Sequence, residues 1–127
     1  MAESFYKEDL VNVELSNGEI HRSYMCHTIG QSDDDANWFG VRLFRNGEPV
    51  SLTGCSVQGV FKQPGRSPIV ISSGNYISGN VAEVLLPQSC YTYEGQFTLA
   101  IRLINSGEGV AGTMRIVDGM VVSTNQQ

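Results

Sequence analysis

The amino-acid sequence predicts an all-β domain, an immunoglobulin-like antiparallel β-sandwich of about seven to nine strands. Apolar and polar residues alternate through most of the chain, as they do in half-buried strands. Turn-forming residues recur about every eight to twelve positions, which is typical of sandwiches and barrels. The chain has 127 residues, which is the size of one such domain.

In the first half of the chain, alternating segments are separated by polar loops. Asn46-Gly47 is the strongest hairpin signal, because a type I′ turn needs a positive φ at both central residues. The polar, acidic residues 31–37 are expected to form a loop. The strands expected here are residues 11–15, 20–29, 38–45 and the return segment 50–52.

The second half repeats this pattern with shorter segments. Gln63 to Arg66 contains Pro and Gly at their favoured turn positions, and Pro87 ends a strand because it cannot donate to a ladder. A short helical turn is expected within residues 88–94, and Asp118-Gly119 is expected to form a second type I′ turn. The strands expected here are residues 57–62, 69–71, 76–77, 81–86, 96–103, 110–117 and 120–122.

These segments divide the chain into three parts. Residues 1–9 are expected to form an N-terminal arm, residues 10–123 the sandwich, and residues 124–127 a C-terminal tail. No internal repeat or linker interrupts the sandwich. We therefore expect a one-domain protein with no second functional module.

Charge and hydropathy exclude several classes of function. Eight basic residues against 13 acidic ones give a net charge of −5, which argues against a nucleic-acid partner because phosphate binding needs a basic patch. No apolar run is long enough for a transmembrane helix, so no membrane contact is expected. The polar, acidic start has no signal-peptide character, which favours the cytoplasm as the place of synthesis and folding.

The three cysteines, Cys26, Cys55 and Cys90, are widely spaced and contain no C-x-x-C pair. This spacing excludes a zinc ribbon or a thioredoxin-like site. Their odd number fits a reducing compartment. We expect three free, half-buried thiols and no antibody-type disulfide.

Two sets of residues resemble metal ligands, and neither forms a complete site. Asp33, Asp35 and Asn37 match the opening of a calcium loop, but the match ends at Trp38, where the loop needs glycine. A solvated loop tip is therefore expected, with a weak calcium site as the alternative. His21 and His27 share a strand face but lie about 20 Å apart, too far for one ion. No metal or cofactor is expected.

No catalytic constellation is recognisable, so the protein is not expected to be an enzyme. The sequence has no nucleophile elbow, no phosphate-binding loop and no singled-out pair of carboxylates. Four aromatic residues could contact a glycan or a protein partner, although ordinary packing would also account for them. Apolar residues on both faces of segments such as 81–86 favour a subunit interface. The four aromatic residues are Trp38, Tyr76, Tyr91 and Tyr93.

Four stretches together resemble the N-terminal domain of tailed-phage baseplate upper proteins. Their order is a strand with x-G-x-P-V-x-L, a strand ending in K-x-P-G, a strand ending in L-P, and then G-x-F-x-L-x-I. Short phage head-fibre and capsid-associated proteins are similar as well. The stretches are Trp38 to Leu52, Val57 to Gly65, Val81 to Pro87 and Glu94 to Ile101.

The resemblance implies an immunoglobulin-like sandwich that docks onto another virion protein and often trimerises. It implies a structural protein of the phage particle, assembled in the host cytoplasm. The expected partners are the major capsid protein or a tail or baseplate component, and further copies of the chain. Baseplate members continue into receptor-binding regions, whereas this chain stops at Gln127. That difference favours a decoration or head-fibre protein over a long fibre. A carbohydrate-binding module for host attachment is the alternative.

Overall fold

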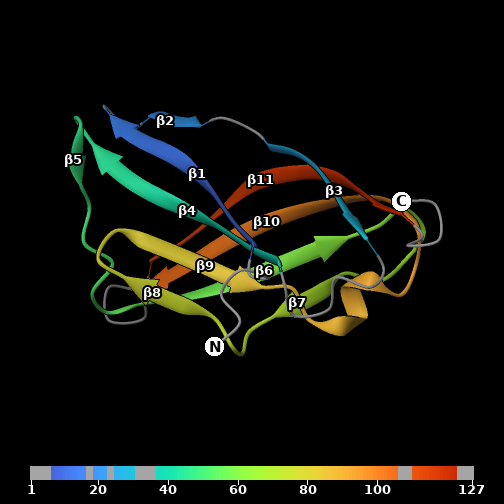
Figure 1. The fold of residues 1–127 in the computed structure, drawn as a ribbon. Coiled ribbons are helices and arrows are strands. Elements are labelled where there is room, and N and C mark those ends of the chain that lie inside the picture. Colours follow the sequence, from blue (N-terminus) through green and yellow to red (C-terminus); the bar gives the residue numbers. More distant parts are fainter. Residues whose placement is uncertain (1–6, 17–18, 23–24, 31–36, 106–109, 123–127) are drawn as a thin grey trace.

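The computed structural model describes residues 7–16, 19–22, 25–30, 37–105 and 110–122. They form two β-sheets packed face to face, with one short 3₁₀ helix, η2 (Gln88–Tyr91), at one end of the sandwich (Figure 1). The predicted all-β sandwich is thus confirmed. No helix in these ranges is long and apolar enough to cross a membrane.

The first sheet contains six strands. Five of them follow the order β2-β1-β4-β9-β8, and β5 pairs with the C-terminal end of β4. β1 and β4 run parallel to each other, whereas the other pairs are antiparallel. The strand bounds are β1 (Lys7–Ser16), β2 (Glu19–Arg22), β4 (Asn37–Arg45), β5 (Glu48–Pro49), β8 (Tyr76–Ser78) and β9 (Val81–Leu85).

The second sheet contains five strands in the order β3-β11-β10-β6-β7. Its centre is the long antiparallel pair of β10 and β11, which spans the length of the sandwich (Figure 1). β3 pairs parallel to β11. The strand bounds are β3 (Met25–Gly30), β6 (Cys55–Lys62), β7 (Ile69–Ile71), β10 (Gly95–Asn105) and β11 (Val110–Val122).

This order follows the immunoglobulin pattern. β4, β9 and β8 occupy the places of strands B, E and D, and β6, β10 and β11 those of C, F and G. The parallel strand β3 lies beside β11, and β7 extends the sheet next to β6. The chain therefore changes sheets between β9 and β10, where η2 forms the corner.

Several local expectations differ from the structure. Residues 20–29, expected to form one strand, contribute to two strands in different sheets, β2 and β3, and β1 begins at Lys7, within the expected N-terminal arm. The described strands number eleven rather than seven to nine, and two of the pairings are parallel. Residues 50–52 are not a strand, because β5 ends at Pro49. Asp118-Gly119 is not a turn: both residues lie within β11 and pair with β10 on one side and β3 on the other. The two flanking strands hold this dipeptide extended.

The Asn46-Gly47 hairpin is confirmed. Its turn also contacts β1 and so helps to hold β1 in its parallel pairing with β4. Asn46 has φ 52° and Gly47 φ 79°, as a type I′ turn requires. The Glu14 carboxylate on β1 accepts hydrogen bonds from both turn amides, at 2.7 Å from Asn46 N and 2.9 Å from Gly47 N. Glu14 thereby fixes the end of β1 beside the end of β4.

The core lies between the two sheets and consists of inward-facing residues from both. Phe61 and Phe97 stack within it, with ring centroids 4.9 Å apart, an arrangement that contributes beyond the apolar area it buries. Cys90 is a buried residue of η2, and burial raises the pKa of its thiol to about 12. The largest fully buried apolar side chains are Phe39, Phe61, Phe97, Ile29, Leu86, Leu99, Ile101 and Ile116.

Candidate docking surfaces

The outer face of the five-stranded sheet carries an apolar strip between two cations. Val70, Val60 and Ala100 lie in one row across β7, β6 and β10, because Val60 pairs with both of the others. Lys62 occupies the neighbouring row on one side and Arg102 the neighbouring row on the other. Val70 is 57% exposed, and both cations are exposed. We call these five residues the outer strip.

A β-bulge shapes the adjoining part of this face. The pairing of β10 with β11 shifts after Leu99, so that Ile116 and Val117 are both buried. The shift places Arg115 and Asp118 on the same outer face, where Arg115 Nη2 and Nε donate to Asp118 Oδ1 at 2.6 and 2.8 Å. An open groove of about 750 Å³ runs from this pair toward Lys62.

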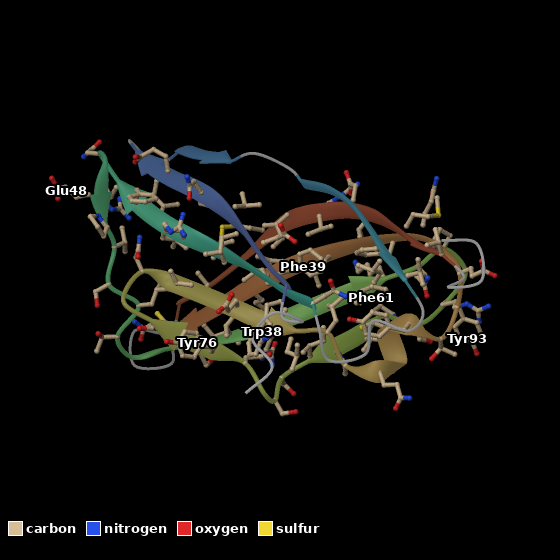
Figure 2. The ribbon with its side chains drawn as sticks, viewed as in Figure 1. Trp38, Phe39, Glu48, Phe61, Tyr76 and Tyr93 are labelled. Carbon is tan, nitrogen blue, oxygen red and sulfur yellow. The ribbon has the colours of Figure 1, made fainter. Side chains whose placement is uncertain are left out.

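Tyr93 lies at the end of the sandwich, after the η2 corner (Figure 2). The Arg66 guanidinium lies 3.3 Å from the centroid of its ring, in a cation–π contact. Gln63 Nε2 donates to the Tyr93 carbonyl at 2.9 Å. Tyr93 is 46% exposed, but Arg66 covers one face of its ring.

Trp38 and Tyr76 lie on the outer face of the other sheet. Trp38 pairs with Leu85 and Tyr76 with Glu83 in adjacent rows. Glu83 is buried beside Gly40, and a Cβ at Gly40 would lie 2.5 Å from the Glu83 Cβ. Trp38 is half-buried and Tyr76 is 50% exposed. This surface is separate from Tyr93, as Figure 2 shows.

Tyr91 lies in the interior, with only 3% of its surface exposed. Its hydroxyl accepts a hydrogen bond from Asn37 Nδ2 at 2.9 Å, which ties the η2 corner to the start of β4. Tyr91 therefore has a packing role and is not available for stacking on a ligand. The four predicted aromatic residues do not form one platform: two share a face, one lies at the end of the sandwich, and one is buried.

The remaining predicted sites fall largely outside the described residues. Of the acidic loop, the structure describes Asn37 alone, and this residue is buried rather than solvated. The side chains of His21, His27 and Cys26 are likewise outside the description. Cys55 and Cys90 are free thiols, as predicted. Among the described residues, no group of three or more His, Cys, Asp or Glu side chains could hold a metal ion.

Lys62 and Arg102 were not singled out by the sequence. Each occupies a polar position in an alternating strand, which predicts exposure but not proximity. Their arrangement around the same apolar row depends on the register between β6 and β10. The sequence gives no direct signal for that register, because residues 58–62 and 98–102 are far apart in the chain.

Comparison with known proteins finds similarity in structure rather than in sequence. No protein-family model matches the chain, and no curated protein matches it by sequence. Among solved structures, the chain is similar to the N-terminal domain of phage TP901-1 ORF48, a baseplate upper protein. The match covers 92% of this chain and 98% of that one, with a TM-score of 0.53 and 11% sequence identity.

This match agrees with the resemblance carried by residues 38–52, 57–65, 81–87 and 94–101. In each case the similar protein is the N-terminal domain of a phage baseplate upper protein. The alignment extends over almost the whole of both chains, so the two domains share one sandwich rather than a fragment. At 11% identity, the match shows a common fold.

Proposed function

We propose that this protein is a structural component of a phage particle, where it docks onto other virion proteins. One observation carries the proposal: the chain has the same fold, over 92% of its length, as the N-terminal domain of a phage baseplate upper protein. The proposal places the protein in the virion after assembly in the host cytoplasm. It includes no catalytic step and no cofactor.

The sandwich offers two kinds of docking surface. In the described part of the chain, β2, β8, β3 and β7 end their sheets, and such edges can accept a further strand from a partner. The outer face of the five-stranded sheet also exposes apolar side chains, with Val70 57% and Met120 38% exposed. Burial of such side chains against a partner is a common source of association free energy.

A place in the tail has more support than a place on the head. The structural match is with a baseplate component, so the proposed partners are tail or baseplate proteins. Decoration of the capsid through the major capsid protein, as a head fibre, is the less supported arrangement. We further propose that residues 10–123 act as one docking unit and that the protein assembles as a homo-oligomer, with a trimer as the first state to test.

Carbohydrate binding has less support from the arrangement of the aromatic residues. Tyr91 is buried, and Arg66 covers one face of the Tyr93 ring. Trp38 and Tyr76 remain on one face, but they lie on different strands with Leu85 and Glu83 of β9 between them. Docking onto protein therefore accounts for more of the surface than sugar stacking does.

Immunogold electron microscopy tests the proposed location. Particles of a phage carrying this gene are labelled with an antibody against the purified protein, and particles from a gene-deleted phage serve as the control. We expect gold at the tail tip of the parent particles and none on the control. Label confined to the capsid would contradict the tail location. Absence of label from both, with the protein found only in the host lysate, would contradict the structural role.

A further inference from the structure

We infer that the outer strip is the surface that binds the partner, and that the partner presents an apolar side chain flanked by carboxylates. The inference rests on the proposed function and adds the surface and its chemistry. The occupant it specifies is a protein segment with acidic side chains.

The five-stranded sheet differs in charge from the chain as a whole. Its five strands contain three basic residues, Lys62, Arg102 and Arg115, and one acidic residue, Asp118. The whole chain has a net charge of −5. The basic side chains all lie on the outer face. A face of the opposite sign to the rest of the protein attracts an acidic partner and orients it during encounter.

Two of the three cations are available to a partner. Arg115 is already bound by Asp118 through two hydrogen bonds to one carboxylate oxygen. In contrast, neither Lys62 nor Arg102 is in a salt bridge with any residue in the described ranges. Each is exposed and can therefore take a carboxylate from outside without first losing an internal one.

The apolar residues of the outer strip, which lie between the rows of these two cations, supply an apolar contact. Val60 and Ala100 are half-buried between Lys62 and Arg102, and Val70 extends the row to the edge strand β7. Lys62 lies opposite Thr98, four residues before Arg102 on β10, so the two cations are about 13 Å apart along the strands. A partner that matches has carboxylates at a comparable spacing with an apolar residue between them.

This arrangement favours a protein over a polyphosphate such as DNA. Phosphate chains are bound by dense rows of cations, because each contact releases condensed counterions. Here two available cations are separated by three apolar side chains, and the third is neutralised by Asp118. Apolar residues with a charged rim are the composition of protein interfaces.

The test uses purified full-length protein and particles from a phage with this gene deleted. Rebinding is measured by co-sedimentation for the wild type, for Lys62→Glu/Arg102→Glu and for Arg42→Glu/Arg45→Glu. The second double variant is the matched control, since it makes the same change in net charge on β4 of the other sheet. Circular dichroism and thermal unfolding confirm that each variant is folded before it is used.

We expect Lys62→Glu/Arg102→Glu to weaken rebinding by roughly tenfold or more, and the control to bind within about twofold of the wild type. Wild-type rebinding is expected to weaken as salt is raised. If the wild type rebinds and both variants rebind equally well, the assigned surface is wrong while the proposed function stands. If the wild type does not rebind, the proposed function itself is contradicted. Binding of duplex DNA that Lys62→Glu/Arg102→Glu abolishes would overturn the choice of a protein partner.

Discussion

Arg115 and Asp118 lie side by side on the outer face of β11, although three positions separate them along a strand. In a regular strand, residues an odd number apart face opposite sides. The bulge at Ile116 and Val117 turns both of these apolar residues inward and brings the two charged side chains together. The bulge therefore lets β11 accommodate one additional residue without turning over either part of the strand.

Deletion of Ile116 should be strongly destabilising. With Ile116 deleted, Val117 directly follows Arg115 and the strand alternates regularly, so Met114 and Val121 still face inward. The cost is the lost packing of the Ile116 side chain, which is fully buried between the sheets. We expect a loss of about 3 kcal/mol or more in the free energy of unfolding, measured with urea. Arg115→Ala is the control and should cost less than about 1 kcal/mol. Equal effects of the two changes would contradict the contribution of the buried Ile116 side chain to the core.

Gly40→Ala should disrupt the contact between β4 and β9. A Cβ at this position would meet the Ala82 carbonyl oxygen and would lie 2.5 Å from Glu83 Cβ and 2.7 Å from Glu83 Cα. Because two of these atoms are backbone, relief requires the strands to separate, at a cost of about 2 kcal/mol or more. Urea unfolding measures the change.

Gly112→Ala is the matched control for this substitution. Gly112 also lies in a strand, but nothing lies within 4 Å of its added Cβ. Replacement of glycine by alanine in an open position restricts the unfolded chain, so the effect should be neutral or slightly stabilising. If Gly112→Ala lowered the free energy of unfolding as much as Gly40→Ala does, crowding beside Glu83 would not be the cause of the loss at Gly40.

Tyr91→Phe should cost about 1 to 3 kcal/mol, because it leaves the buried Asn37 amide without its acceptor. Tyr93→Phe is the control: this hydroxyl is in no hydrogen bond with a described residue and its ring is 46% exposed. The free energy of unfolding of Tyr93→Phe should stay within about 0.5 kcal/mol of the wild-type value. Thermal or urea unfolding of the two variants compares these effects directly. A Tyr91→Phe protein as stable as the wild type would contradict a stabilising role for the hydrogen bond between Asn37 of β4 and Tyr91 of η2.

The Cys90 thiol should remain protonated and unreactive in the folded protein. Burial raises its pKa to about 12, so iodoacetamide at pH 8.5 should modify Cys55 but not Cys90 until the protein unfolds. Peptide mass spectrometry of the alkylated protein distinguishes the two sites. Modification of both thiols at equal rates in the native state would contradict the burial of Cys90.

The same shift predicts the pH dependence of stability. Below pH 9 the Cys90 thiol is protonated in both the folded and the unfolded state, so its contribution to the free energy of unfolding is fully present. Between pH 9 and about 12 the unfolded chain loses the proton and the folded chain keeps it, so the free energy of unfolding falls. In this pH range the free energy of unfolding of the wild type should fall about 1.4 kcal/mol per pH unit more steeply than that of Cys90→Ala. Identical slopes would contradict this assignment.

Local features of the fold could be predicted from the sequence, whereas pairings between distant segments could not. Asn46-Gly47 forms the expected turn because its backbone requirement is met by the dipeptide itself. Asp118-Gly119 has a similar local signal but lies in a strand, since β10 and β3 pair with it on both sides. Tertiary pairing overrides local preference there.

The candidate site shows the same division. Alternation in residues 96–103 predicts that Arg102 faces away from the core. That Lys62 lies on the same face, with Val60 and Ala100 between the two, depends on a register set by packing. Tyr91 was expected as a possible contact residue, because an aromatic side chain combines a large apolar area with a polar group. Its burial follows from the change of sheet between β9 and β10, which directs the η2 corner inward.

The most direct test of the central claim is quantitative mass spectrometry of gradient-purified phage particles. We predict that this protein is present at a fixed copy number per particle, comparable to that of other tail components, and that the number is unchanged by a second round of purification. Its absence from purified particles, with the protein retained in the host lysate, would contradict the claim that it is a structural component of the virion.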